Sequence, residues 1–213
     1  MLLELERTKV VEYGKELIKR KITVGTFGNI SIYNPEKKLM AISPSGLDYF
    51  NTQVADVVVV DLEGNVVDGD LKPSSEVDLH RVFYQKRPDV RAVVHTHSEF
   101  ATVLSCLRKP IPPLHYIVGY SGKEVPCIPY YAFGTEELAE AALKGMGDNH
   151  AVIMGNHGLL AVGPSIEYTM DVAEQCEFAA MLYYRCLAVG EPVVLTEDEM
   201  QEVIGKFDHY RKR

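Results

Sequence analysis

Two histidines separated by one residue, His95 and His97, follow the short apolar run at residues 92–94. Side chains two residues apart on a β-strand point to the same face of the sheet. The two imidazoles can therefore meet at one point where the strand ends. Imidazole is the commonest metal ligand in proteins, and two imidazoles aimed together suit zinc or a similar ion. From the spacing alone, two surface histidines at a strand end are an equally good interpretation.

A third histidine ends a second apolar run, because residues 151–154 are followed by Gly155, Asn156, His157 and Gly158. A catalytic zinc is held by three protein ligands and keeps one position open, whereas a structural zinc is closed by four ligands, usually including cysteine. No cysteine is close in sequence to the three histidines, which favours the catalytic type. The other histidines lack a glycine-flanked strand end, and we expect them beside the site, in the core or on the surface: His80, His115, His150 and His209.

Three turns rich in glycine and hydroxyl side chains, at residues 23–29, 43–46 and 72–76, precede the histidine pair. Backbone N–H groups and neutral side-chain donors in such turns can bind a phosphate without lysine. Each turn is a weak signal alone, but three of them before a His-x-His pair predict an anion site. The donors are Thr26, Gly28, Asn29, Ser45, Gly46, Ser74 and Ser75.

Apolar periodicity predicts the elements that position these residues. We expect helices at residues 3–20, 76–85, 98–107, 135–144, 164–188 and 196–206, and strands at 29–33, 39–43, 57–61, 66–67, 90–95, 125–129 and 150–154. In this scheme Ser74 or Ser75 caps the second helix and Glu76 lies in its first turn, where the helix dipole favours a carboxylate. Helix capping is the simplest interpretation of Glu76.

The composition limits the class of protein. The 213 residues fit one domain, and a hydrophobic content of 46% is ordinary for a globular core. A net charge of -8 argues against nucleic acid as the main partner. The four cysteines form no C-x-x-C pair and lie among apolar residues, as in a reducing compartment. Without a signal peptide or a membrane-length apolar run, the chain is expected to be soluble and cytoplasmic.

Seven motifs share the order and approximate spacing of a known family from the first predicted helix to the tail. They are Thr26-Phe27-Gly28-Asn29, Pro44-Ser45-Gly46, Pro73-Ser74-Ser75-Glu76, His95-Thr96-His97, His115-Tyr116, Phe133-Gly134-Thr135 and Asn156-His157-Gly158. Together they resemble the class II zinc aldolases (aldolase and adducin-like proteins), typified by L-fuculose-phosphate aldolase. The resemblance covers essentially the whole chain, and the combined motifs are highly specific.

The resemblance implies a fold and a reaction. The fold is an α/β fold with a central, mainly antiparallel sheet flanked by helices, as one domain over residues 1–213. The reaction is reversible cleavage of a ketose 1-phosphate, such as L-fuculose 1-phosphate, to dihydroxyacetone phosphate and an aldehyde such as L-lactaldehyde. The family also implies a homotetramer with active sites at subunit interfaces, and a small sugar phosphate as partner, without nucleic acid or membrane.

The resemblance also assigns roles to residues. It implies one Zn²⁺ per subunit on His95, His97 and His157, with Glu76 as a further ligand or as the catalytic acid–base group. It places the substrate phosphate on the three turns. Tyr116 would reach the site of a neighbouring subunit, and Tyr210 would act from the C-terminal tail.

Some features leave alternatives open. Phe27 and Ser45 replace residues that are usually small or threonine, and residues 119–123 differ from the expected small residues, which leaves the aldehyde undetermined. An L-ribulose-5-phosphate 4-epimerase should carry an Asp after the His-x-His helix, and residues 111–123 contain none. A methylthioribulose-phosphate dehydratase shares the His-x-His framework. An adducin-like scaffold would have lost the zinc ligands, which this sequence keeps.

Overall fold

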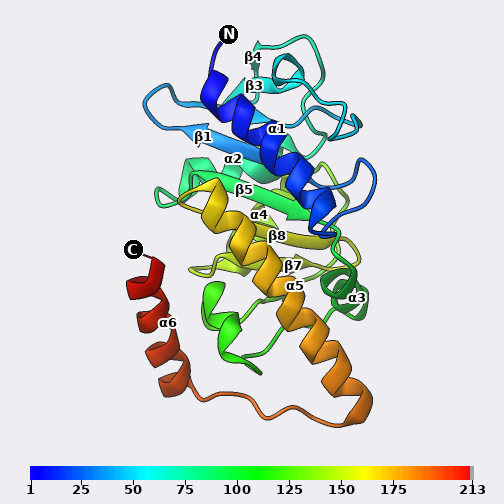
Figure 1. The fold of residues 1–213 in the computed structure, drawn as a ribbon, viewed down its shortest axis with the longest axis vertical. Helices are drawn as coiled ribbons and strands as arrows, with labels where there is room; N and C mark the ends of the chain where they lie inside the picture. Colours follow the sequence, from blue (N-terminus) through cyan, green and yellow to red (C-terminus); the bar gives the residue numbers. More distant parts are fainter. Residues whose placement is uncertain (212–213) are drawn as a thin grey trace.

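The computed structural model describes residues 1–211 of the chain, with the side chains of residues 1–207. Over these residues, one sheet of eight strands is flanked by helices on both faces (Figure 1). The strand order is β4-β3-β2-β1-β5-β8-β7-β6. Neighbouring strands are antiparallel except β6 and β7, which are parallel. The predicted α/β fold with a mainly antiparallel sheet and flanking helices is confirmed.

The elements have the following bounds. The strands are β1 (Asn29–Asn34), β2 (Leu39–Ile42), β3 (Val58–Asp61), β4 (Val66–Asp68), β5 (Ala92–Thr96), β6 (Cys127–Ile128), β7 (Ala151–Met154) and β8 (Gly158–Gly163). The helices are α1 (Glu4–Lys19), α2 (Val77–Lys86), α3 (Glu99–Leu107), α4 (Glu136–Met146), α5 (Ile166–Val189) and α6 (Glu197–Arg211). Two short 3-10 helices are η1 (Val54–Asp56) and η2 (Tyr116–Tyr120).

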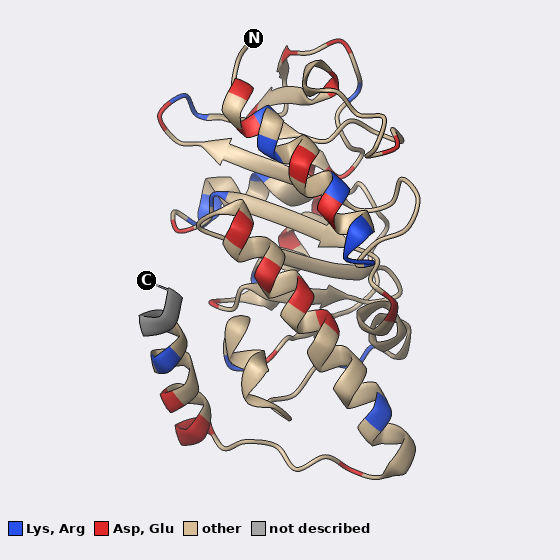
Figure 2. Ribbon diagram, viewed as in Figure 1, with Lys and Arg blue, Asp and Glu red and all other residues tan. Residues whose placement is uncertain are grey.

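The sheet separates two hydrophobic cores. In β5, Ala92 and Val94 pack into the core beneath α1, α3 and α5, whereas Val93 packs into the core beneath α2 and α4. This alternation follows the two-residue period of a strand, and it makes both faces of the sheet apolar. Charged residues accordingly lie on the helices and loops, while the central strands carry none (Figure 2). A sheet covered on both sides is a rigid support for side chains at its strand ends.

The observed elements differ from the sequence-based expectation in two places. The strand β8 was not predicted, because Gly-Leu-Leu-Ala-Val-Gly shows no alternation and contains one β-branched residue, Val162. The helix α2 begins at Val77, so Glu76 occupies the N-cap position without a side-chain cap. The expected serine cap of this helix is therefore wrong, and the Ser74 hydroxyl instead accepts the N–H of Glu76 at 3.3 Å. At the start of α4 the Thr135 hydroxyl caps the helix by accepting the N–H of Leu138 at 3.2 Å.

Candidate active site

Three histidine side chains meet at one end of the central strands. His95 lies near the end of β5, and His97 follows that strand directly. His157 lies in the turn between β7 and β8. Because β5 pairs with β8, with Thr96 opposite Leu159, this turn lies beside the end of β5. One nitrogen from each imidazole lies within 4.8 Å of the others, so the three rings can share one ion.

The turn before β8 leaves little freedom at Gly158. A Cβ at this position would overlap the carbonyl oxygen of Thr96 and crowd the rings of His97 and His95. Asn156 adopts a left-handed conformation with φ of 54°, which closes the tight hairpin. These two positions bring His157 against the other strand end.

A carboxylate completes the cluster. Glu76, only 6% exposed, places Oε2 at 3.3 Å from His95 Nε2 and Oε1 at 3.3 Å from His157 Nε2. The Nδ2 group of Asn29 donates to Glu76 Oε2 at 2.9 Å. Glu76 Oε1 is buried and has no hydrogen-bond partner among the described residues. An uncompensated carboxylate oxygen in a buried site is costly, and a cation would compensate it.

The environment sets the charges of this cluster. Burial lowers the pKa of His95 and His97, and a neighbouring histidine lowers each further. Burial and the proximity of His95 lower the pKa of His157 to about 4. Burial alone raises the pKa of Glu76, but the imidazoles of His95 and His157 and the Asn29 amide outweigh it, so the pKa lies below its ordinary value. At neutral pH the site therefore holds neutral imidazoles and an ionised carboxylate.

The three turns border a cavity of about 420 Å³ above this cluster. The predicted residues that line it are Thr26, Gly28, Asn29, Ser45, Gly46, Ser74, Ser75, Glu76, His97 and His157. His95 is fully buried at its base, where a Cβ at Gly28 would strike its carbonyl oxygen. Tyr130 and Tyr131 also line the cavity, and no sequence motif indicates a role for them. Phe27 lines it as well, with its ring stacked on His97 at 5.5 Å between centroids.

Comparison with known proteins identifies the family. Residues 8–184 match the family described as "Class II Aldolase and Adducin N-terminal domain". The chain belongs to this family. A 5-deoxy-D-ribulose 1-phosphate aldolase of Bacillus thuringiensis serovar kurstaki is 48% identical, over 99% of each chain. An L-fuculose phosphate aldolase of Haemophilus influenzae is 36% identical, over 96% of this chain and 94% of the relative. A solved L-fuculose 1-phosphate aldolase structure superimposes with a TM-score of 0.94 at 42% identity, covering 95% of this chain and 96% of the other.

As a class II aldolase, the protein is a lyase. The membership in this family that the sequence motifs predict is confirmed. Members of this family typically depend on a metal, and the chemistry of the donor set fits one. The Nδ1 group of the neutral His95 donates to the carbonyl oxygen of Leu159 at 2.9 Å, which leaves the lone pair of Nε2 directed at the cluster. Within the described part of the chain, no helix has the length and hydrophobicity needed to cross a membrane.

The start of α3, which follows His97 closely in the chain, is held by a side chain of α5. Glu177 of α5 accepts the N–H of Phe100 at 2.8 Å and the N–H of Ala101 at 2.9 Å. These two groups belong to the first turn of α3, where backbone N–H groups lack partners within the helix. The long helix α5 thus fixes the segment that carries His97.

Of the two predicted tyrosines, the structure describes the side chain of Tyr116 only. Tyr116, in η2, is half exposed, and its ring stacks on Phe207 of α6 with centroids 6.0 Å apart. It lies outside the cavity of its own chain. The side chain of Tyr210 lies outside the described residues.

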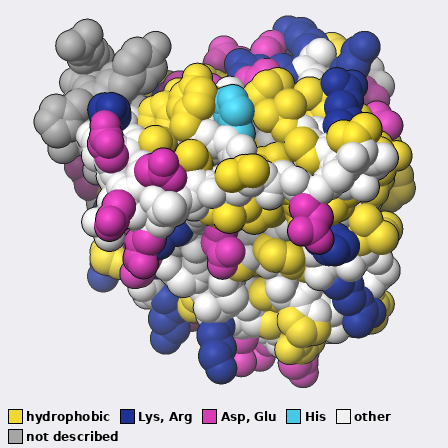
Figure 3. Space-filling view, turned by 90° about the horizontal axis from the view of Figure 1, so that it is seen from below, with side chains coloured by type: hydrophobic (Ala, Val, Ile, Leu, Met, Phe, Trp, Pro, Cys, Tyr) yellow, Lys and Arg dark blue, Asp and Glu magenta, His cyan; other side chains and the backbone are white. Residues whose placement is uncertain are grey.

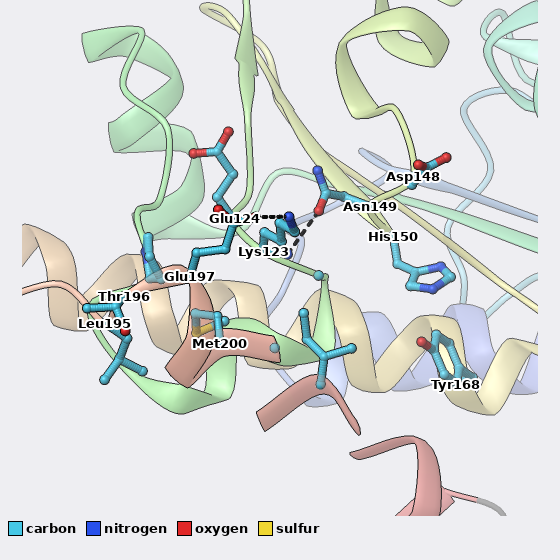
Figure 4. A pocket seen from close by; sticks show the side chains of 14 residues that line it. Lys123, Glu124, Asp148, Asn149, His150, Tyr168, Leu195, Thr196, Glu197 and Met200 are labelled. Carbon is cyan, nitrogen blue, oxygen red and sulfur yellow. Dashed lines mark hydrogen bonds and ion pairs between the residues drawn. The ribbon is translucent and has the colours of Figure 1, made fainter. Parts of the chain in front are cut away.

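A second, larger cavity of about 710 Å³ lies between the loop after η2 and α6 (Figure 4). Lys123 pairs there with Glu197 of α6, and the backbone N–H of Lys123 donates to Asn149 Oδ1 at 3.1 Å. Asp148, His150 and Tyr168 also line this space. None of the cavity's lining residues belongs to the three-histidine cluster.

Proposed function

We propose that the enzyme is a zinc-dependent aldolase that reversibly cleaves a ketose 1-phosphate to dihydroxyacetone phosphate and a short aldehyde. The observation that carries the proposal is the meeting of three neutral imidazoles and a buried carboxylate at the base of a cavity bordered by three donor-rich turns. His95, His97 and His157 would hold the ion, with Glu76 beside it. When bound, zinc supplies Lewis-acid stabilisation of the negative charge that develops on the substrate oxygens.

Glu76 is proposed to move the proton at carbon. In the cleavage direction the C4 hydroxyl loses its proton and the C3–C4 bond breaks. The electron pair stays on the dihydroxyacetone phosphate fragment, and C3 must then receive a proton. Glu76 lies at the base of the cavity, and Asn29 holds one of its oxygens. A carboxylate in this position can transfer that proton in either direction.

The turns are proposed to hold the substrate phosphate. The backbone and side-chain donors of Thr26, Gly28, Asn29, Ser45, Gly46, Ser74 and Ser75 face one cavity from three separate loops. Among the described side chains, no lysine or arginine lines the cavity. A site of neutral donors holds a phosphate by hydrogen bonds, and it fixes the distance from the phosphate to Glu76.

We propose a 5-deoxypentulose 1-phosphate as the preferred substrate, with acetaldehyde as the second product. The support is the 48% identity, over nearly the whole of both chains, to a 5-deoxy-D-ribulose 1-phosphate aldolase. Apolar rings from Phe27, Tyr131 and Phe133 at the cavity suit a methyl-terminated aldehyde. L-Fuculose 1-phosphate, which would release L-lactaldehyde, is the second candidate. Its support is the solved structure of an L-fuculose 1-phosphate aldolase, which superimposes with a TM-score of 0.94.

We also propose a homotetramer in which Tyr116 completes the site of an adjacent subunit and exchanges a proton with the aldehyde oxygen. Exposed apolar side chains gather on α3, η2 and α5, including Leu107, Tyr116, Phe178, Tyr184 and Leu187. Figure 3 shows hydrophobic side chains exposed among charged ones on the face seen from below. Light scattering should give a mass of four 23.8-kDa chains. A monomer in solution would contradict this arrangement.

The test of the reaction is aldol synthesis from dihydroxyacetone phosphate with acetaldehyde or L-lactaldehyde, in the presence of zinc and after removal of metal by EDTA. We expect product with both aldehydes, a higher kcat/KM with acetaldehyde, and loss of product after chelation. Product formation that survives complete metal removal would contradict the zinc-dependent reaction. A higher kcat/KM with L-lactaldehyde would reverse the order of the two substrates and leave the reaction class intact.

A further inference from the structure

A row of buried polar side chains runs from the helix α2 to Glu76. The hydroxyl of Tyr84 lies 2.6 Å from Ser31 Oγ, and Ser31 Oγ lies 2.7 Å from His80 Nδ1. His80 Nε2 lies 2.5 Å from Asn29 Oδ1, and Asn29 Nδ2 donates to Glu76 Oε2 at 2.9 Å. Ser31 and His80 are completely buried, and the other members are at most 6% exposed. Two residues on α2 and two on β1 thus connect the core to the proposed acid–base group.

The direction of each hydrogen bond in this row follows from its end at Glu76. An ionised carboxylate only accepts hydrogen bonds, so the amide of Asn29 must present Nδ2 to Glu76 and Oδ1 to His80. The Oδ1 atom also only accepts, so the proton of a neutral His80 must lie on Nε2. Burial lowers the pKa of His80 to about 3, which keeps the ring neutral.

The same logic fixes the far end of the row. The Nδ1 atom of His80 accepts, so the Ser31 hydroxyl must donate to it. The hydroxyl of Tyr84 stays protonated because burial raises its pKa. It donates to Ser31, whose hydroxyl and carbonyl oxygens lie at 2.6 and 3.0 Å. One arrangement of protons therefore satisfies every member, and all the bonds point toward Glu76.

We propose that His80 is a positioning residue for the aldol reaction, which holds the Asn29 amide in the one orientation that donates to Glu76. The inference rests on the proposed role of Glu76. Without a donor at His80, Asn29 Oδ1 loses this hydrogen bond, and the amide is held only by its bond to Glu76 and can turn away from the carboxylate. Glu76 Oε2 would then lose the hydrogen bond from Asn29 Nδ2 that holds the carboxylate between His95 and His157. His80 itself lies outside the cavity lining, so it acts only through Asn29.

The effect should fall on turnover and spare substrate affinity. The backbone of Asn29 keeps its place in β1 whichever way its amide points, because it pairs there with His95. The phosphate donors on the other two turns are unaffected. An interaction that acts on the group moving the proton changes kcat, whereas the Michaelis constant for dihydroxyacetone phosphate reports the unchanged donors.

The first experiment reads the proton positions directly and needs no reaction. The ¹⁵N NMR spectra are recorded on protein from which metal has been removed with EDTA. The ring signals of His80 are assigned as those missing from the spectrum of the His80→Gln variant. We expect the Nε2–H tautomer, unchanged between pH 8 and pH 5. A proton on Nδ1 would overturn the proposal whether or not the protein is an aldolase.

The second experiment compares His80→Gln with His80→Leu in synthesis from dihydroxyacetone phosphate and acetaldehyde. Gln can supply an N–H near the position of Nε2, whereas Leu has a similar size and no donor. We expect His80→Leu to lower kcat about 10- to 100-fold, as for the loss of a hydrogen bond to a charged group. His80→Gln should stay within about threefold of the wild type, and neither change should move KM by more than about twofold. Equal kcat values for the two variants would overturn the proposal.

Matched controls separate positioning from stability. Ser105 is a completely buried serine on α3 whose hydroxyl bonds to Thr102, remote from this row. Ser105→Ala should leave kcat unchanged. Ser31→Ala, a small truncation that allows the other His80 tautomer, should lower kcat in the same direction as His80→Leu, and it decides the matter if His80→Leu fails to fold. An unchanged kcat in Ser31→Ala would then overturn the proposal. Wild-type protein that makes no product with zinc, but shows the Nε2–H tautomer, would instead contradict the proposed function.

Discussion

The two cavities described above differ in chemical character, and the difference does not follow their sizes. The cavity beside α6, at about 710 Å³, is the larger, and its lining includes the exposed ion pair of Lys123 and Glu197. The cavity of about 420 Å³ has the three histidines and Glu76 at its base. The comparison teaches that chemistry follows from the convergence of buried side chains and that cavity volume is a poor guide to it.

The difference originates in the elements that build each space. The smaller cavity is formed where strand ends of the doubly covered sheet meet the turns before β1, before α2 and before β8. Asn29 and Glu76 in this cavity are connected by hydrogen bonds to the buried His80. The larger cavity is closed by α6, a helix that contacts η2 and contributes Glu197, Met200 and Ile204 to the lining. Exposed charges are solvated and interact weakly, so they do little to fix a substrate.

The largest expected effect is loss of the histidine cluster. His157→Ala removes one of the three proposed zinc ligands of the smaller cavity, and we expect kcat/KM to fall by at least about 10⁴-fold, the equivalent of several kcal/mol of charge stabilisation. Elemental analysis should show lost zinc in the same preparation. Wild-type protein treated with EDTA should lose activity to the same degree and regain it with zinc, which His157→Ala cannot do. Full activity in metal-free His157→Ala would refute the assignment.

The next effect concerns Glu76. Glu76→Gln keeps the shape of the side chain and removes its ability to accept a proton, so kcat should fall by about 10²–10⁴-fold. Zinc content is measured alongside, because a variant that retains metal separates proton transfer from metal binding. Wild-type turnover in a zinc-loaded Glu76→Gln enzyme would exclude Glu76 as the acid–base group.

The phosphate turns should give a smaller effect of another kind. Ser75→Ala removes one hydroxyl donor, and the Michaelis constant for dihydroxyacetone phosphate should rise about tenfold, as expected for one hydrogen bond to a charged group. Ser75→Thr, which keeps the hydroxyl, is the matched control and should stay near the wild type. If inhibition by inorganic phosphate is equally strong in Ser75→Ala and the wild type, Ser75 does not bind the phosphate.

The buried histidines also predict a pH dependence of stability. His80 has a pKa of about 3 in the folded protein, below its ordinary value of 6.5, so the unfolded chain binds more protons between these values. The free energy of unfolding of the metal-free protein should therefore fall as the pH drops below about 6.5. The fall is about 1.4 kcal/mol per pH unit for each histidine whose pKa is lowered in this way by folding. Urea unfolding at pH 7.5 and pH 5 measures this slope. His80→Gln should show a slope smaller by one proton, and an identical slope would show that His80 titrates normally.

The smallest effect belongs to the larger cavity. Lys123→Gln breaks the ion pair with Glu197 at an exposed site, and we expect kcat and KM to stay within about twofold of the wild type. The same substrates and zinc concentration are used as for His157→Ala. A loss comparable to that of the histidine variant would mean that the larger cavity takes part in the reaction.

Much of this fold could be predicted from local sequence patterns. The His-x-His pair follows a β-branched strand, and the long helix at α5 has a clear apolar face. The strand β8 could not be recognised, because its six residues are buried on both faces and so show no alternation. Its pairing with β5 brings His157 beside His95 across 62 positions, a contact that depends on tertiary structure.

The candidate site could be predicted from the sequence only in part. Motif resemblance gathered the donors of the three turns, and the structure places them around one cavity. Glu76 had a simple local interpretation as a residue in a capped helix start, and only its contacts with His95 and His157 distinguish it from one. Nothing in the sequence indicated the role of His80, because its partners Ser31 and Asn29 lie about 50 positions away. Side-chain networks between distant elements leave no periodic signal.

The hairpin between β7 and β8 has a consequence for how the protein is made. During synthesis His95 and His97 are available long before His157, and two imidazoles alone do not form a three-ligand site. The third ligand arrives only when β8 has been translated and has paired with β5. At the proposed zinc site, metal capture would therefore be a late event in biogenesis, coupled to a long-range pairing that is slow to form. A nascent chain that stops before Gly158 would present an incomplete site with little affinity for zinc, so incomplete chains would not compete with finished enzyme for the ion.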